Sequence, residues 1–310
     1  MQRFLSTATI VGLLIATAAA FAITERLKLT KSPITGTHVT KTFSPTCSCA
    51  TSKARISVKL RRGDSVNVTV DDAHRRPVRT LTSADRIPRG RTVFTWDGTT
   101  DSGERAPDGV YFVQIHLIDQ HRTILLPNAI VLDTTPPEVL DATPNRMQFS
   151  PDGDHQADSV TVHYTLSEPA HVLVFLRGTR IIRSRFHKVE DVFTWTGRLG
   201  GRLLPQGTYT LTVGAVDLAG NTTPVARQGH VRVELRYITL ASHRIAGVIA
   251  GRPFDIGVST DAKRYSWKLG ARKGVAHGAD LKLRAPAKPG TYLLTVTEHG
   301  HSDRAVVIAR

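Results

Sequence analysis

An internal repeat constrains the fold of this chain more than any other feature of its sequence. Phe43-Ser44-Pro45 returns as Phe149-Ser150-Pro151 at an offset of 106 residues, and Phe94-Thr95-Trp96 returns as Phe193-Thr194-Trp195 at an offset of 99. Self-similarity at this distance predicts two copies of one compact module. The offset falls because the first copy carries extra residues, which we place in a loop after Val70.

Each copy alternates apolar and polar residues with a period of two. One such row is Tyr111, Val113, Ile115 and Leu117, and the second copy repeats it as Tyr209, Leu211, Val213 and Ala215. Short rows of this kind, separated by Gly, Pro and Asp turns, are typical of half-buried strands in a sandwich of about 90–100 residues. The sequence therefore predicts an all-β fold.

Two short motifs recur between these rows, W-x-G and P-x-G-x-Y, and a third, A-x-D-x-x-G-N, occurs in the second copy. In P-x-G-x-Y, proline presets φ, glycine permits a positive φ, and the tyrosine hydroxyl can bond to a nearby backbone group. The motif residues are Trp96, Gly98, Pro107, Gly109 and Tyr111 in the first copy, and Trp195, Gly197, Pro205, Gly207, Tyr209, Asp217, Gly220 and Asn221 in the second. The first copy lacks the last motif and has Asp119-Gln120-His121 in its place.

Together the motifs resemble the FlgD-type Ig-like repeat, a module named for the C-terminal region of the flagellar hook-capping protein. The resemblance covers residues 42–233 and implies tandem Ig-like β-sandwiches, a fold common in bacterial surface and secreted proteins. The pair Pro136-Pro137 makes a stiff linker, so we expect domains at 42–133 and 138–233. Residues 234–310 resemble a third, small Ig-like domain, because Pro289-Gly290-Thr291-Tyr292 echoes the Gly-x-Tyr element.

Residues 1–30 contain an apolar segment. No charged residue occurs in the 21 positions 4–24, a length that crosses a hydrocarbon core of about 30 Å as a helix. Ala20-Phe21-Ala22 also matches a signal-peptidase site, so the segment is either an uncleaved transmembrane signal anchor or a signal peptide cleaved after Ala22. The uncharged length favours the anchor, which predicts a single-pass protein of the cell membrane; cleavage predicts a secreted one.

The orientation of the chain is less direct. Arg26, Lys28 and Lys31 follow the apolar segment and only Arg3 precedes it, so the positive-inside rule places the C-terminal part in the cytoplasm. We nevertheless expect that part outside the cytoplasm, because its repeated β-modules are typical of extracytoplasmic proteins.

The loop that opens the second copy has carboxylates suited to a cation. Asp152, Asp154 and Asp158 offer hard oxygen ligands to Ca²⁺, although the spacing of an EF-hand is absent. The loop resembles the Phe-Ser-Pro-Asn-Gly-Asp entry loop of related extracellular β-modules. The competing interpretation, which we favour, is a polar turn into a strand over 159–166. Apart from this Ca²⁺, no cofactor is expected.

The first copy has Cys47 and Cys49 at the corresponding place. Two cysteines separated by one residue can close a small disulfide in an oxidising compartment, which we favour. The alternatives are free or intermolecularly paired thiols and a weak soft-metal site.

Near the C-terminus, Glu298-His299-Gly300-His301-Ser302-Asp303 places two imidazoles and two carboxylates in six residues. A metal site is one interpretation. We favour a hairpin tip between strands over 292–297 and 304–308, with Gly300 supplying the turn.

Basic charge is the remaining feature with functional content. The chain has 41 Lys+Arg against 26 Asp+Glu, a net charge of +15. Alternate strand positions share a face, so we expect one basic face at Arg55, Lys59, Arg61 and Arg62, and another at Arg183 and Arg185. Such faces attract polyanions, here anionic wall polymers or lipid headgroups, unless they are ordinary solvated surface. Few aromatics and no reading motif argue against nucleic acid.

No catalytic motif, phosphate loop or dinucleotide fingerprint is visible, so we do not expect an enzyme. The expected function is a non-catalytic, membrane-tethered envelope scaffold for structure, adhesion or binding. Its expected partners are the membrane and either an anionic envelope polymer or another envelope protein. The alternative is an accessory carbohydrate- or protein-binding subunit of an envelope enzyme, or of a flagellar or surface assembly system.

Overall fold

The computed structural model describes residues 11–22, 32–185 and 188–310. Residues 11–22 form a helix, and within the described ranges no helix has the length and apolar character that a membrane crossing requires. The rest of the apolar segment and the flanking Arg3, Arg26, Lys28 and Lys31 lie outside the described residues.

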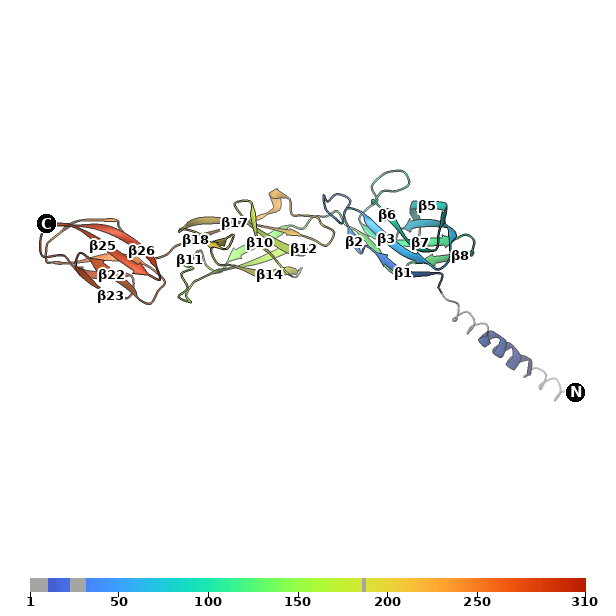
Figure 1. Cartoon of the computed structure of the whole chain (residues 1–310), viewed down its shortest axis with the longest axis horizontal. Helices are drawn as coiled ribbons and strands as arrows, with labels where there is room; N and C mark the ends of the chain where they lie inside the picture. The colour runs from blue at the N-terminus through green and yellow to red at the C-terminus, as the bar shows by residue number, and fades with distance from the viewer. Residues whose placement is uncertain (1–10, 23–31, 186–187) are drawn as a thin grey trace. The chain divides into compact units, whose positions relative to one another are not determined.

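The remaining described residues are mostly strands, which divide between two compact units, 1–134 and 135–310 (Figure 1). The first unit contains a sandwich of a three-stranded sheet, ordered β1-β3-β6, and a six-stranded sheet, ordered β2-β9-β7-β4-β5 with β8 beside β7. The strands are β1 Ile34–Val39, β2 Thr42–Phe43, β3 Ala54–Leu60, β4 Asp64–Asp71, β5 Pro77–Ile87, β6 Gly90–Trp96, β7 Gly109–Leu117, β8 Arg122–Leu125 and β9 Ile130–Leu132. This first module therefore starts at Ile34, ahead of the predicted boundary at 42.

The second unit contains two sandwiches, of which the first is the second copy of the repeat. Its strands are β10 Val139–Pro144, β11 Gln148–Phe149, β12 Val160–Leu176, β13 Thr179–Arg183, β14 Lys188–Trp195, β15 Arg198–Leu199, β16 Arg202–Leu203, β17 Gly207–Val216 and β18 Gly229–Leu235, with a 3₁₀ turn at Val225–Arg227. The long β12 pairs with β10 and β14 over its first half and with β17 over its second half. It thus serves both sheets, as β3 and β4 do in the first copy.

The third module follows in the same unit. Its strands are β19 Thr239–Leu240, β20 Arg244–Val248, β21 Pro253–Ser259, β22 Tyr265–Leu269, β23 Arg272–Ala276, β24 Asp280–Arg284, β25 Gly290–Glu298 and β26 His301–Ala309. They form a three-stranded sheet, β19-β21-β24, and a five-stranded sheet, β20-β26-β25-β22-β23. Tyr237 still packs in the core of the second module, whereas Ile238 belongs to that of the third. The core boundary therefore falls between these two residues rather than at 233.

The two copies share one aromatic arrangement in their cores. Trp96 lies 5.2 Å from Phe43 and 4.8 Å from Tyr111 between ring centroids. In the second copy, Trp195 lies 5.5 Å from Phe149 and 5.8 Å from Tyr209. All are buried, and tilted ring pairs of this kind stabilise a core beyond the burial of their area. The repeated Phe, Trp and Tyr positions are therefore core positions.

The turn motifs also have a physical cause. The Tyr111 hydroxyl donates a hydrogen bond to the Pro107 carbonyl at 2.6 Å, and Tyr209 bonds to Pro205 at the same distance, which confirms the expected tie of each tyrosine to its turn. The glycine of W-x-G has a positive φ in both copies. At Gly197, a Cβ would lie only 2.8 Å from Leu235 Cδ1, so a side chain is excluded by space as well as by conformation.

The first copy replaces its missing Gly-Asn turn with a different polar contact. In the second copy, Asp217 accepts hydrogen bonds from the backbone of Gly220 and Asn221. In the first copy, the buried Asp64 accepts them from the Asp119 backbone and the Gln120 side chain instead. The extra residues of this copy lengthen β5 to 11 residues, against five in β13.

Candidate functional site

Carboxylates from the second and third modules meet within the second unit. Asp152 and Asp154 lie in the loop after β11, and Glu298 and His299 lie where β25 ends. One ligand atom of each of these four residues lies within 4.8 Å of the others. The arrangement joins the Asp-rich loop and the histidine-containing hairpin tip, which the sequence offers as two separate candidate metal sites.

Hydrogen bonds inside the loop separate the three predicted Ca²⁺ ligands. The Asp158 carboxylate accepts the backbone N–H groups of Gly153 and His155 at 2.7 and 2.9 Å, so it closes the turn and does not join the cluster. Asp152 accepts the Asp154 backbone N–H, and its side chain is 1% exposed. The structure therefore places two of the three predicted residues at the junction and gives the third a role in the turn.

Glu298 is the more buried of the two residues that the third module contributes to this cluster. Its side chain is 2% exposed, and its Oε2 accepts a hydrogen bond from the Thr260 hydroxyl. Its Oε1 is buried and accepts no hydrogen bond, although His299 Nδ1 lies 3.6 Å away. Burial, together with the carboxyls of Asp152 and Asp261, raises the pKa of Glu298 to about 7.

A fourth carboxyl, Asp261, adds to the negative charge of this junction. Burial, together with the charges of Asp152 and Asp154, raises its pKa to about 6. Its Oδ2 is buried and accepts no hydrogen bond. Lys263 and Arg264 line a hollow beside the cluster, but among the described residues neither forms an ion pair with it. The carboxyls are therefore not neutralised by the nearby cations.

Solvent-accessible hollows adjoin the cluster. One of about 590 Å³ is lined by Asp154, Glu298 and His299, and another of about 280 Å³ by Asp261. At the same junction, Tyr237 stacks on His301 with ring centroids 3.5 Å apart. Burial lowers the pKa of His301, so this imidazole favours its neutral form. A small cation can thus reach the carboxyls from solvent.

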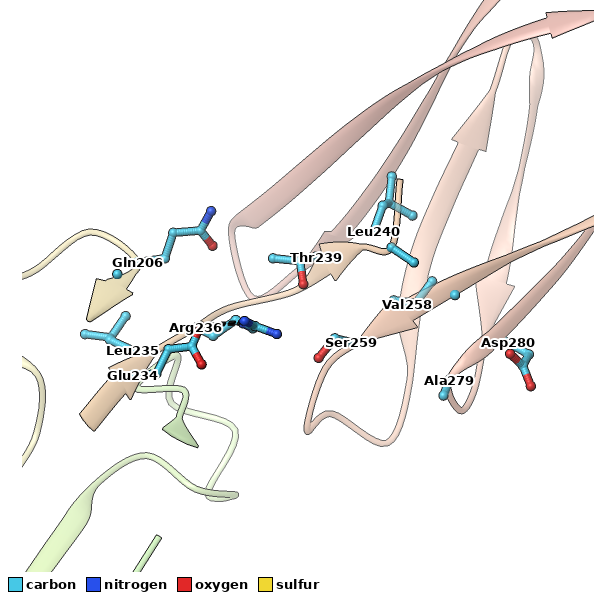
Figure 2. Close-up of a pocket in the computed structure, with 13 residues that line it drawn as sticks. Gln206, Glu234, Leu235, Arg236, Thr239, Leu240, Val258, Ser259, Ala279 and Asp280 are labelled. Atoms are coloured by element: carbon cyan, nitrogen blue, oxygen red, sulfur yellow. Dashed lines mark hydrogen bonds and ion pairs between the residues drawn. The ribbon is translucent and has the colours of Figure 1, made fainter. Parts of the chain in front are cut away.

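Another hollow lies elsewhere on the same unit, between the ends of β17 and β18 and the strands β19 and β21. It measures about 720 Å³, and Figure 2 shows Glu234, Arg236, Ser259 and Asp280 around it. Two of its charged groups neutralise each other, because the Arg236 guanidinium forms an ion pair with the Glu234 carboxylate at 2.5 Å. A ligand site needs convergent polar groups that are available for binding, and this hollow is poor in them.

A basic face covers the β1-β3-β6 sheet of the first module. Arg55 and Lys59 alternate with buried residues on β3, and their side chains are exposed. Arg91 on β6 pairs directly opposite Lys59, so the two side chains share a face. None of these three forms an ion pair with a described residue. The strand register places no acidic residue beside these three. The neighbouring positions on the same face are Thr35, His38, Ser57, Val93 and Thr95.

The other predicted basic residues lie apart from that face. Arg61 and Arg62 follow the end of β3, and the Arg61 Nε donates to the Ser32 carbonyl at 2.9 Å. Arg183 is the last residue of β13, and Arg185 lies beyond the end of that strand. The two arginines therefore do not form the second basic face that strand alternation predicted. Several further arginines of the first module are ion-paired: Arg76 with Asp72, Arg79 with Asp101 and Arg86 with Asp119.

Cys47 and Cys49 are joined by a disulfide in the loop that leads into β3. The Thr51 hydroxyl lies 3.0 Å from Cys49 Sγ. This loop holds no carboxylate at the places of Asp152 and Asp154, so the two copies of the repeat differ chemically at their entry loops.

Glu298 belongs to a segment for which the sequence offers a metal site as one interpretation and a hairpin tip as the favoured one, and β25 and β26 do form that hairpin. Two further residues at these surfaces were not singled out from the sequence. Asp261 carried no sequence signal, because an isolated Asp is common in turns. Arg91 did carry a sequence signal, because it lies opposite Lys59 once β3 and β6 are paired, but this pairing was not predicted.

The two-sheet sandwiches, the repeated core and the tyrosine corners define a protein of tandem Ig-like domains. In particular, the model of the FlgD Ig-like domain family matches residues 44–120, within the first module. The first module is therefore a FlgD-type Ig-like domain, and the second copy shares its motifs. This fold is typical of non-catalytic structural and binding proteins. No similar sequence was found among curated proteins.

Solved structures with related folds share little sequence with this chain. A three-Ig structure of titin domains is 12% identical and covers 90% of this chain and 99% of its own, with a TM-score of 0.33. Fibronectin(III)-like modules of Clostridium thermocellum CbhA are 13% identical, covering 65% and 94%, with a TM-score of 0.34. A bacterial ice-binding adhesin is 11% identical, covering 90% and 98%, with a TM-score of 0.30.

Proposed function

We propose that this chain is a non-catalytic scaffold of the cell envelope whose first module binds an anionic polymer. The observation that carries the proposal is the basic face of Arg55, Lys59 and Arg91, which are exposed and lack acidic partners on one sheet. Lys59 and Arg91 repel each other across the strand pair, which disfavours their juxtaposition unless an anion binds there. Arginine and lysine in an open array suit a repeating polyanion rather than a small enclosed ligand.

The uncharged N-terminal run supports export of the modules, and the short Cys47–Cys49 bridge is compatible with an oxidising compartment. We expect activity from a C-terminally fused reporter of a kind that works only outside the cytoplasm. An inactive reporter in cells that make the full-length fusion would contradict this part of the proposal.

Polymer binding is tested by retention on purified cell wall that carries its anionic polymers. We expect retention of the full chain at low salt and release at high salt, because ions screen exposed charges within about 10 Å at 0.1 M. The triple variant Arg55→Thr, Lys59→Thr, Arg91→Thr should lose most of this retention.

A matched control separates the face from net charge. The variant Arg76→Thr, Arg86→Thr, Arg122→Thr also removes three positive charges from the first module, but two of these arginines are already ion-paired. It should keep most of the retention. Equal loss in both triple variants would mean that only net charge matters, and retention insensitive to salt would favour an uncharged carbohydrate or a protein partner instead.

A further inference from the structure

A second site lies in the other unit, apart from the basic face. We propose that Asp152, Asp154 and Glu298 bind a Ca²⁺ ion at the junction of the second and third modules, with Asp261 adding negative charge beside them. This inference is independent of polymer binding, because it concerns different residues in a different unit.

The geometry is the first support. Ligand atoms of Asp152, Asp154, Glu298 and His299 lie within 4.8 Å of one another, which is close enough for one ion to contact them together. Asp152 and Glu298 are 1% and 2% exposed at their side chains. Carboxylates buried side by side repel each other and lose hydration, which is costly unless a positive charge compensates them.

The unsatisfied oxygen of Glu298 is the second support. Its Oε1 is buried, faces the cluster and accepts no hydrogen bond, whereas its Oε2 is bonded to Thr260. A buried acceptor without a donor is uncommon in folded proteins and calls for a missing partner. The His299 imidazole lies 3.6 Å from this oxygen, beyond hydrogen-bond distance, and is half exposed.

The chemistry of the donors selects the ion. Three carboxylates, with a fourth nearby and room for water in the adjoining hollows, form a hard oxygen set of the kind that Ca²⁺ prefers. Zinc favours histidine and cysteine ligands, and here only the exposed His299 offers nitrogen. Lys263 and Arg264 line one of these hollows, and neither forms an ion pair with an acid among the described residues.

The origin of the ligands indicates a role for the ion. Two come from the loop after β11 in the second module, and Glu298 comes from β25 in the third. One ion would therefore connect the two modules and hold their junction in one arrangement. Since an ion that binds only the assembled junction stabilises it by mass action, Ca²⁺ should raise the melting temperature of the chain.

The test is calorimetric titration of the full, chelator-treated chain with Ca²⁺, combined with thermal melting. We expect saturable binding and a higher melting temperature with Ca²⁺. Glu298→Gln and Asp154→Asn should each weaken binding at least tenfold. Glu190→Gln, which changes an exposed acid on β14, should leave it unchanged.

Circular dichroism establishes that each variant is folded, and Tb³⁺ luminescence, displaced by Ca²⁺, gives a second reading of occupancy in Asp154→Asn. Absence of heat, of a melting shift and of displaceable Tb³⁺ in the unmodified chain would overturn the proposal. Binding of Zn²⁺ alone, abolished by His299→Ala, would overturn the assignment to Ca²⁺.

Discussion

On the sheet formed by β1, β3 and β6, the first module exposes Arg55, Lys59 and Arg91. The second module carries Thr161, Thr165 and Glu190 at the corresponding positions of β12 and β14. The strand register is the same in both, since Lys59 pairs with Arg91 and Thr165 pairs with Glu190. The shared backbone thus does not require basic residues on this face.

The entry loops differ in the same way. The first copy closes its loop with the Cys47–Cys49 disulfide, whereas the second presents Asp152 and Asp154 toward the third module. By contrast, both copies keep the same Trp–Tyr ring contact in the core and the same bond from the tyrosine hydroxyl to a proline carbonyl. The repeated residues therefore maintain the fold, and the two copies differ in the charged and polar groups that they expose.

The largest expected effect tests the shared part. Trp96→Ala and Trp195→Ala each remove a buried ring that contacts a Phe and a Tyr. Each should destabilise its own module by about 3–5 kcal/mol, because the lost burial leaves a cavity. Urea unfolding followed by circular dichroism measures this, with Val93→Ala on the exposed face as a control. A much smaller cost in one copy would break the equivalence of the two cores.

An intermediate effect tests the junction of the second and third modules. The pKa of Glu298 is raised to about 7 in the folded state, above its ordinary value of 4.5. The folded state therefore holds this proton more tightly, so its contribution to stability is complete below pH 4.5 and is lost as the pH rises through about 7. Asp261 has the same effect on stability, because its pKa is raised to about 6, and its contribution is lost as the pH rises through that value.

In the presence of a chelator, we expect the unmodified chain to lose more stability than Glu298→Gln between pH 5 and pH 8. Urea midpoints at both pH values measure the difference, and Glu190→Gln is the exposed control. Saturating Ca²⁺ should reduce the decline, because the ion replaces the proton. A parallel pH response in the unmodified chain and Glu298→Gln would contradict the assignment.

The smallest expected effect on stability comes from exchanging the sheet faces. Thr161→Arg, Thr165→Lys and Glu190→Arg give the second module the basic triad of the first, and should change stability by no more than about 0.5 kcal/mol per substitution, since the positions lie on the solvent face. In the Arg55→Thr, Lys59→Thr, Arg91→Thr background, this exchange should restore salt-sensitive retention on cell wall. Failure to restore it would show that the first module contributes more than the triad.

Much of the fold follows from local sequence, because strand alternation and turn chemistry act over a few residues. The repeat, the sandwich and the tyrosine corners are all visible in short motifs such as Pro107–Tyr111. The extent of the basic face was less predictable. Arg55 and Lys59 share a strand, but Arg91 joins them only through antiparallel pairing, and Arg61 leaves the face because β3 ends at Leu60.

Local sequence is enough to show that this chain forms repeated Ig-like sandwiches and to place Asp152 and Asp154 in a polar turn. That Glu298 and Asp261 lie beside them follows from the packing of the folded chain. The physical reason is that the packing of two modules brings together loops more than 100 residues apart. Whether a carboxylate is solvated or buried among others depends on that packing, and no local pattern records it.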